Sequence, residues 1–284
     1  MLETSGGSSK RTRWPRYQHI IFDCDSTLSS VEGIDELADQ EQQRRRISAL
    51  TDAAMDGEIP LQEVYGERLR ILQPTRGEVR LLRAQYKKHV VEDAAALIEH
   101  LRTLGHEIYI VSGGLLDPVR EFGISLGVDA DNIRAVDVEY DALSGDWWRS
   151  KPADWDQQYL AYAHSALSES HGKSRIIAEL LDGKQGTSML VGDGVSDLLA
   201  SPGVDLFVGY GGVITRERVA AEAPAFLRSA SLSPLLLLAS GAAGARQLEG
   251  QASTEFVAKA YKLLEDGALA FNEPSLRGRF LNSL

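Results

Sequence analysis

Residues 19–27 read HIIFDCDST, a short apolar run that stops abruptly at two aspartates, Asp23 and Asp25. An apolar run that ends in turn-forming polar residues predicts a buried strand followed by a loop. The same pattern occurs three more times along the chain, each time with a loop that carries Gly or Asp. These segments are Ile108–Val111 followed by SGG, Met189–Val191 followed by GDGVSD, and Leu206–Val208 followed by GYGG.

Helical patterns lie between these strands. Apolar residues recur at helical spacing from Ala94 to Leu104 before Gly105, and a second helix opens at Asp117-Pro118 and closes at Gly127. Strands that alternate with helices predict an α/β fold with a doubly wound parallel sheet, in which ligands bind beyond the carboxyl ends of the strands. The four polar loops are expected at that edge.

The segment between the first two strands is longer than a single crossover helix needs, and it reads mainly as helix. We therefore expect a small helical cap domain, inserted after the first strand and lying over the active edge. A smaller β-like piece follows around Val136, Val138 and Tyr140. The predicted organisation is a disordered N-terminal tail over 1–17, an α/β core over 18–28 and 90–240, a helical cap over 29–89, and a C-terminal extension of unknown role over 241–284.

The composition limits the partners of this chain of 284 residues. Its 30 Lys and Arg against 41 Asp and Glu give a net charge of −11, which disfavours binding to nucleic acid or to an anionic membrane. No apolar run approaches the length of a membrane span, and the N-terminus lacks the pattern of a signal peptide. The single cysteine, Cys24, fits a reducing compartment, so we predict a cytoplasmic protein. The oligomeric state is not predicted.

The two aspartates after the first strand suit metal binding, nucleophilic attack or proton transfer. An EF-hand loop also begins D-x-D, but its required Gly would fall on Leu28 and its terminal Glu on Ile34. A simple helix cap is the alternative for an isolated D-x-D. The other loops weaken that alternative, because SGG offers a hydroxyl and backbone N–H groups for phosphate and Asp193 offers a further acid for a cation.

The ordered set DCDST, SGG, Lys173 and GDGVSD resembles the four motifs of the haloacid dehalogenase superfamily. Within it, the segments DCDSTLSSVEGIDELA, AAMDGEIPLQEVYGERLRILQP and GYGGVITRERV resemble the phosphoserine phosphatase family, most of all its animal-type branch. The resemblance covers roughly residues 18 to 235. The stretch 147–170 departs from it, being longer and rich in aromatic residues, and Ser196 stands where many relatives have Asn.

This resemblance implies a Mg²⁺-dependent phosphomonoesterase that hydrolyses O-phospho-L-serine to L-serine and phosphate, the last step of serine biosynthesis, through an aspartyl-phosphate intermediate. The partner would be a small-molecule phosphomonoester. The implied roles at the phosphate end are Asp23 as nucleophile, Asp25 as general acid and base, Asp23, Asp193 and the backbone carbonyl of Asp25 as Mg²⁺ ligands, and Ser112, Gly113 and Lys173 as binders of the transferring phosphoryl group.

In the cap, the resemblance implies that Glu32 binds the substrate ammonium and that Arg68 binds its carboxylate. Met55 and Leu61 would wall the pocket, and Ser196 and Arg216 are further candidates for substrate binding. Taken singly, Glu32 could be a first-turn helix acid and Arg68 an exposed helical residue. Two functional alternatives stay open: a phosphatase or phosphotransferase for another small phosphorylated metabolite, and a non-enzymatic aspartyl phospho-acceptor module of a signalling protein.

Overall fold

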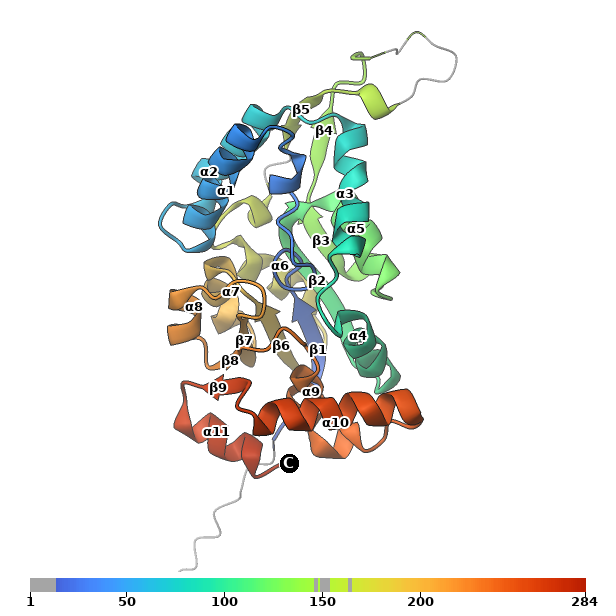
Figure 1. The fold of residues 1–284 in the computed structure, drawn as a ribbon, viewed down its shortest axis with the longest axis vertical. Coiled ribbons are helices and arrows are strands. Elements are labelled where there is room, and N and C mark those ends of the chain that lie inside the picture. The colour runs from blue at the N-terminus through green and yellow to red at the C-terminus, as the bar shows by residue number, and fades with distance from the viewer. Residues whose placement is uncertain (1–13, 146–147, 149–153, 163–164) are drawn as a thin grey trace, which may run out of the picture.

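The structure, a computed structural model, describes residues 14–145, 148, 154–162 and 165–284. Its main sheet consists of β1 (Tyr17–Phe22), β2 (Glu107–Leu115), β3 (Ile133–Val136), β6 (Thr187–Gly192), β7 (Leu206–Tyr210), β8 (Ala225–Leu227) and β9 (Leu269–Phe271). The seven strands lie in the order β3-β2-β1-β6-β7-β8-β9 (Figure 1). Every neighbouring pair is parallel except β8 and β9, which run antiparallel.

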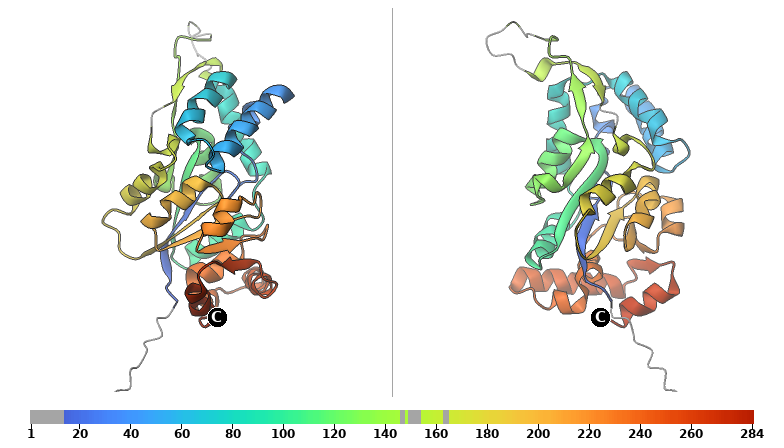
Figure 2. Two further views of the ribbon diagram at one scale, coloured as in Figure 1. Left: turned by 90° about the vertical axis from the view of Figure 1, so that its left-hand side faces the viewer. Right: turned by 180° about the vertical axis from the view of Figure 1, so that it is seen from behind.

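The helices of the α/β part are α4 (Ala94–Thr103), α5 (Leu116–Ser125), α6 (Gly172–Leu181), α7 (Val195–Ala200), α8 (Glu217–Glu222) and α9 (Pro234–Ala245). The chain runs outward from β1 to β2 and β3, then returns past β1 to β6 and β7. Because such connections are right-handed, this reversal puts helices on both faces of the sheet. Figures 1 and 2 show α4 and α9 on one face and α6 and α7 on the other. The predicted doubly wound α/β fold is confirmed.

The central strands are apolar along their length because helices cover both of their faces. Ile20, Ile21 and Phe22 of β1 are completely buried, as are Met189 and Leu190 of β6. Burial on both faces explains why the sequence shows short continuous apolar runs instead of alternation. The loop after β1 lies at the point where the strand order reverses, which is where a doubly wound sheet opens a crevice for ligands.

A helical insertion follows β1, as predicted. It contains α1 (Glu41–Met55), α2 (Leu61–Leu72) and α3 (Arg76–Lys88). Thr75 and Glu78 form a capping box at the start of α3, which satisfies backbone N–H groups of the first turn. Figure 1 shows these helices above the carboxyl ends of the main strands. The insertion therefore covers the edge where the polar loops emerge.

The predicted smaller β piece is a separate two-stranded antiparallel sheet formed by β4 (Val138–Tyr140) and β5 (Tyr159–Tyr162). It lies against the helical insertion: the N–H of Tyr159 donates to the Pro74 carbonyl at 3.1 Å, and the N–H of Arg76 donates to the Gln157 carbonyl at 3.0 Å. Part of the divergent stretch 147–170 lies outside the described residues. Its described part shows that residues 154–162 pack against the helical insertion, although they come much later in the sequence.

The predicted N-terminal tail extended too far. Residues 1–13 lie outside the described part, but Trp14 is buried and Tyr17 already belongs to β1. The Trp14 indole N–H donates to the Leu238 carbonyl at 2.8 Å, and its ring meets Phe280 edge-on with centroids 5.0 Å apart. The buried Trp14 ring and the hydrogen bond of its indole N–H therefore hold this segment against the rest of the protein.

The C-terminal segment extends the main sheet. The predicted boundary between residues 240 and 241 falls inside α9, which bends at Gly241, where φ is 65°. After it come α10 (Gln251–Glu265), β9 and α11 (Pro274–Leu281), and β9 pairs with β8. Figure 1 shows these elements at the end of the sheet opposite the helical insertion. No helix in the described ranges is long and apolar enough to cross a membrane.

Candidate active site

The loop after β1 is a tight turn that presents Asp23 and Asp25 at the sheet edge. The N–H of Asp23 still donates to the Val191 carbonyl at 2.9 Å, so this residue stays attached to the neighbouring strand. The chain then turns back, with Leu28 donating its N–H to the Cys24 carbonyl at 2.9 Å and Ser26 in the left-handed region at φ 51°. Both aspartates are almost completely buried at this edge.

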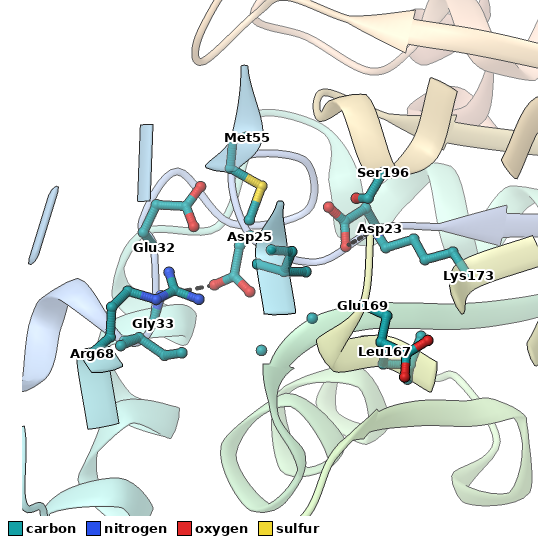
Figure 3. Close-up of a pocket in the computed structure, with 14 residues that line it drawn as sticks. Asp23, Asp25, Glu32, Gly33, Met55, Arg68, Leu167, Glu169, Lys173 and Ser196 are labelled. Atoms are coloured by element: carbon teal, nitrogen blue, oxygen red, sulfur yellow. Dashed lines mark hydrogen bonds and ion pairs between the residues drawn. The ribbon is translucent and has the colours of Figure 1, made fainter. Parts of the chain in front are cut away.

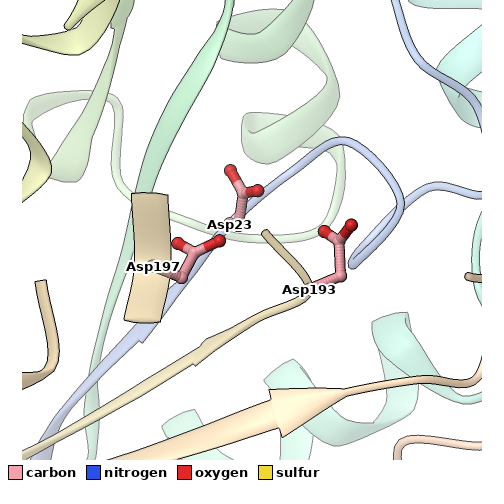
Figure 4. Close-up of side chains that lie close together, drawn as sticks. All are labelled: Asp23, Asp193 and Asp197. Carbon is pink, nitrogen blue, oxygen red and sulfur yellow. The ribbon is translucent and has the colours of Figure 1, made fainter. Parts of the chain in front are cut away.

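Three buried carboxylates meet beside the end of β1, as Figure 4 shows. One oxygen from each of Asp23, Asp193 and Asp197 lies within 4.8 Å of the other two. Asp193 follows β6 directly, whereas Asp197 lies in the first turn of α7. Thr27 donates its hydroxyl to Asp193 at 3.0 Å. Oxygen ligands of this kind are the ones that Mg²⁺ prefers.

Lys173 is the cation nearest to this acidic cluster. Its Nζ lies 2.9 Å from Asp23 Oδ1 and 2.7 Å from Asp197 Oδ1, and the residue is 3% exposed. Gly172, immediately before it, begins α6 so close to the short 3-10 helix Ala166–Ser168 that a Cβ there would lie 1.6 Å from the Ala166 carbonyl oxygen. Only glycine therefore allows α6 to start where it aims Lys173 at Asp23.

The acids perturb one another because they are crowded and desolvated. Burial, reinforced by the charge of Asp23, raises the pKa of Asp25 and of Asp193 to about 6 each. Burial also raises the pKa of Asp197 to about 7, although Lys173 opposes this. For Lys173, burial lowers the pKa, but Asp197 and Asp23 together raise it above its usual value. Clustered shifts of this kind are typical of functional sites.

A pocket opens from these residues toward the helical insertion. Figure 3 shows Glu32 and Arg68 on one side of it, Asp23, Lys173 and Ser196 on the other, and Asp25 between them. The predicted site residues that line this pocket are Asp23, Asp25, Glu32, Met55, Leu61, Arg68, Gly113, Lys173 and Ser196. The structure therefore brings together most of the residues that the sequence singled out.

On the insertion side, the two charged residues are held differently. Glu32 accepts a 2.8 Å hydrogen bond from the Ser26 hydroxyl, and burial, with the charges of Asp25 and Asp193, raises its pKa well above the usual value. Arg68 is 2% exposed, and its Nη1 donates to the Thr51 hydroxyl at 2.9 Å. The guanidinium also lies over the Tyr65 ring, 5.3 Å from its centroid. Within the described residues, no ion pair joins Arg68 to a carboxylate.

Most of these site residues lie in a segment that matches a known protein family. Residues 20–201 match the haloacid dehalogenase-like hydrolase family. The chain belongs to this family.

Curated relatives and solved structures point the same way. Phosphoserine phosphatase of Rattus norvegicus is 29% identical over 201 residues, which cover 70% of this chain and 84% of the relative. The chloroplastic phosphoserine phosphatase of Arabidopsis thaliana is 30% identical over 214 residues, or 74% of this chain and 68% of the relative. A phosphoserine phosphohydrolase-like protein from Francisella tularensis has a similar fold, with a TM-score of 0.64 and 24% identity over 75% of this chain and 95% of that one. This member of the haloacid dehalogenase-like hydrolases therefore resembles phosphoserine phosphatases.

Three predicted site residues of this hydrolase are placed differently from expectation. Ser112 and Gly113 lie within β2 and not in a loop after it, because the strand continues to Leu115. Ser112 is fully buried behind the pocket, where its hydroxyl lies 3.3 Å from Asp25 Oδ2. Arg216 does not line the pocket either. Its guanidinium contacts Asp193 at 3.2 Å and Asp56 of the insertion at 2.9 Å, so it links the α/β part to the insertion.

Several residues at the site had no predicted role. Asp197 belongs to the GDGVSD segment, and its acid type was the available signal. Tyr86 of α3 donates its hydroxyl to Asp25 Oδ1 at 2.7 Å. No local sequence pattern predicts this contact. The further lining residues are Gly33, Ile34, Gly114, Leu167 and Glu169.

Proposed function

We propose that this hydrolase is a Mg²⁺-dependent phosphatase that converts O-phospho-L-serine to L-serine and phosphate. The observation that carries the proposal is Arg68, a buried guanidinium without an acidic partner in the described residues, on the side of the pocket opposite Asp23 and Lys173. An unpaired buried charge is expensive, so its presence in a pocket indicates an anionic ligand group. A phosphomonoester that also carries a carboxylate fits both sides of the pocket, with its phosphate beside Asp23 and Lys173 and its carboxylate beside Arg68.

At the phosphate end, Asp23 is the proposed nucleophile. One of its carboxylate oxygens forms a bond to phosphorus while the bond from phosphorus to the seryl oxygen breaks, and Asp25 donates a proton to that departing oxygen. Water then opens the aspartyl phosphate, and Asp25 takes a proton from it. Lys173, 2.9 Å from Asp23, offsets the charge of the phosphoryl group as the two anions approach.

At the other end, the substrate's carboxylate would pair with Arg68 and its ammonium with Glu32. A guanidinium binds a carboxylate in a two-pronged geometry, which also fixes orientation. Burial disfavours the charged form of Glu32 and so raises its pKa. A substrate ammonium beside Glu32 would favour the charged carboxylate and lower that pKa again. Met55 and Leu61 complete the wall between the two ends.

The residues present also fit a divalent cation, which hydrolases of this family use. Three buried acids, Asp23, Asp193 and Asp197, face only two positive side chains among their described contacts, Lys173 and Arg216. We expect Asp23, Asp193 and the Asp25 carbonyl to hold Mg²⁺, which when bound neutralises phosphoryl charge. Asp197 already pairs with Lys173 and accepts from the Gly194 N–H at 3.2 Å, so its expected role is to orient Lys173.

Phosphate release with Mg²⁺ from three related esters tests the proposal. O-phospho-L-serine carries both groups, O-phosphoethanolamine lacks the carboxylate, and 3-phosphoglycerate lacks the ammonium. We expect kcat/KM to be at least about 30-fold higher for phosphoserine than for either of the others, since each lost charge pair is worth about 2 kcal/mol or more. Equal values for the three would contradict the substrate assignment. No release from any of them, while an alcohol acceptor becomes phosphorylated, would indicate a phosphotransferase.

A further inference from the structure

The proposed acid and base, Asp25, is held from outside its own loop by Tyr86 of α3. The Tyr86 hydroxyl donates to Asp25 Oδ1 at 2.7 Å, and the tyrosine is fully buried. Its ring stacks on Phe122 of α5, with centroids 5.5 Å apart and planes 19° from parallel. The position of this hydroxyl is therefore fixed by packing between the insertion and the α/β part.

A second donor reaches the same oxygen. The Gly33 N–H donates to Asp25 Oδ1 at 2.8 Å. A Cβ at Gly33 would lie 2.0 Å from the Tyr86 hydroxyl oxygen, so only glycine leaves room for both donors. Oδ1 thus accepts from two hydrogen-bond donors, and a proton on this oxygen would have to face one of them.

The other oxygen, Oδ2, accepts a longer hydrogen bond than Oδ1 does. The Ser112 hydroxyl donates to Oδ2 at 3.3 Å and itself accepts from the Gly114 N–H at 2.9 Å. A Cβ on Gly114 would lie 2.6 Å from Oδ2, and Gly113 and Gly114 line the pocket. Oδ2 is therefore the oxygen of Asp25 with the single and longer hydrogen bond, and it lies beside a glycine that lines the pocket.

We propose that Tyr86 is a positioning residue for Asp25. With the Gly33 N–H, it keeps the transferable proton on Oδ2 and turns that oxygen toward the leaving group. The inference rests on the proposed function, because it concerns the step in which the bond from phosphorus to the ester oxygen breaks and Asp25 donates its proton to that oxygen. Without the hydroxyl, the carboxyl group would rotate and share its proton between two oxygens.

The matching test uses Tyr86→Phe, which retains the stacking on Phe122 and removes only the hydroxyl. We would measure kcat/KM for aryl phosphates of similar shape whose leaving groups differ in acidity, from p-nitrophenyl phosphate to phenyl phosphate. This parameter reports the steps up to departure of the leaving group, and these substrates make no use of Glu32 or Arg68. A good leaving group needs little help from an acid, whereas a poor one depends on it.

For Tyr86→Phe, we expect a loss of about 10- to 100-fold on phenyl phosphate and less than about threefold on p-nitrophenyl phosphate, a part of the 10²- to 10⁴-fold that proton transfer supplies. Gly33→Ala should steepen the dependence in the same way, because its methyl group displaces the hydroxyl. The control is Tyr109→Phe, which removes a buried tyrosine hydroxyl that contacts His19 and Lys184. It should change neither substrate.

Two results would overturn the inference. Equal losses on all aryl phosphates would mean that Tyr86 only supports the fold, and unchanged values would mean that its hydroxyl does not position Asp25. Failure of the unmodified protein to hydrolyse any phosphomonoester would instead contradict the proposed function, together with the inference that depends on it.

Discussion

Replacement of Arg68 by methionine should separate recognition of the amino acid from phosphate chemistry. Methionine retains an unbranched side chain and removes the charge that lies, 2% exposed, beside Thr51 and over the Tyr65 ring. Loss of one partner of a buried, hydrogen-bonded charge pair typically costs about 2 to 5 kcal/mol. At about 1.4 kcal/mol per decade, kcat/KM for phosphoserine should fall roughly 30- to 5,000-fold.

Because Arg68 is almost completely desolvated, we expect the loss on phosphoserine to exceed about 100-fold, which corresponds to about 3 kcal/mol. The value for p-nitrophenyl phosphate should stay within about threefold, since that ester carries no carboxylate and uses the groups around Asp23. Thermal stability should be unchanged or higher, because an arginine buried without an acidic partner disfavours folding. The assays are phosphate release at several substrate concentrations and a thermal melt of each protein.

Arg70→Met is the matched control, because Arg70 lies on the same helix two residues later and is exposed. It should leave both substrates unaffected. Equal losses of Arg68→Met on phosphoserine and p-nitrophenyl phosphate would refute the reasoning, because Arg68 would then support the fold or the phosphate end. A marked drop in the melting temperature of Arg68→Met would also refute the reasoning, since it would show that the Arg68 charge has a stabilising partner in the folded protein.

Three further outcomes are expected. Asp23→Asn should abolish phosphate release from every substrate while its circular dichroism spectrum stays that of the unmodified protein, because an amide oxygen is a poor nucleophile; residual turnover above a few per cent would exclude the covalent route. Excess chelator should stop turnover and added Mg²⁺ should restore it, whereas Ca²⁺ should inhibit, since its larger and more flexible coordination shell does not maintain in-line geometry; activity that persists in chelator would contradict a metal role for Asp193. Burial lowers the pKa of His106 in the folded protein to about 4. As the pH falls through about 6.5, His106 of the unfolded chain therefore gains a proton while His106 of the folded protein does not. The free energy of unfolding is unaffected by His106 above about pH 6.5 and decreases as the pH falls below it. Between pH 7 and 5, urea unfolding should therefore show the unmodified protein losing about 2 kcal/mol more than His106→Asn, and equal losses would mean that His106 is not the responsible group.

The sequence alone was enough to predict which segments meet at the carboxyl edge of the sheet. Asp23 and Asp193 directly follow two apolar runs, Gly113 comes two residues after a third, and the carboxyl ends of parallel strands meet at one edge of a sheet. Local pattern and a general rule of topology together therefore predicted which loops would meet. The helical insertion after β1 was predictable for a similar reason, because its length exceeded what one crossover requires.

Only the tertiary structure decided which side chains hold these residues in place. Tyr86 is separated from Asp25 by 61 positions, and Arg216 from Asp56 by 160. The sequence around Trp14 predicts a polar tail, but in the structure its ring packs against Phe280 from the other end of the chain. Periodicity records which face of an element is buried, but it carries no information about which distant element covers that face. Hydrogen bonds across such contacts depend on packing between elements, and that packing is determined only when the whole chain has folded.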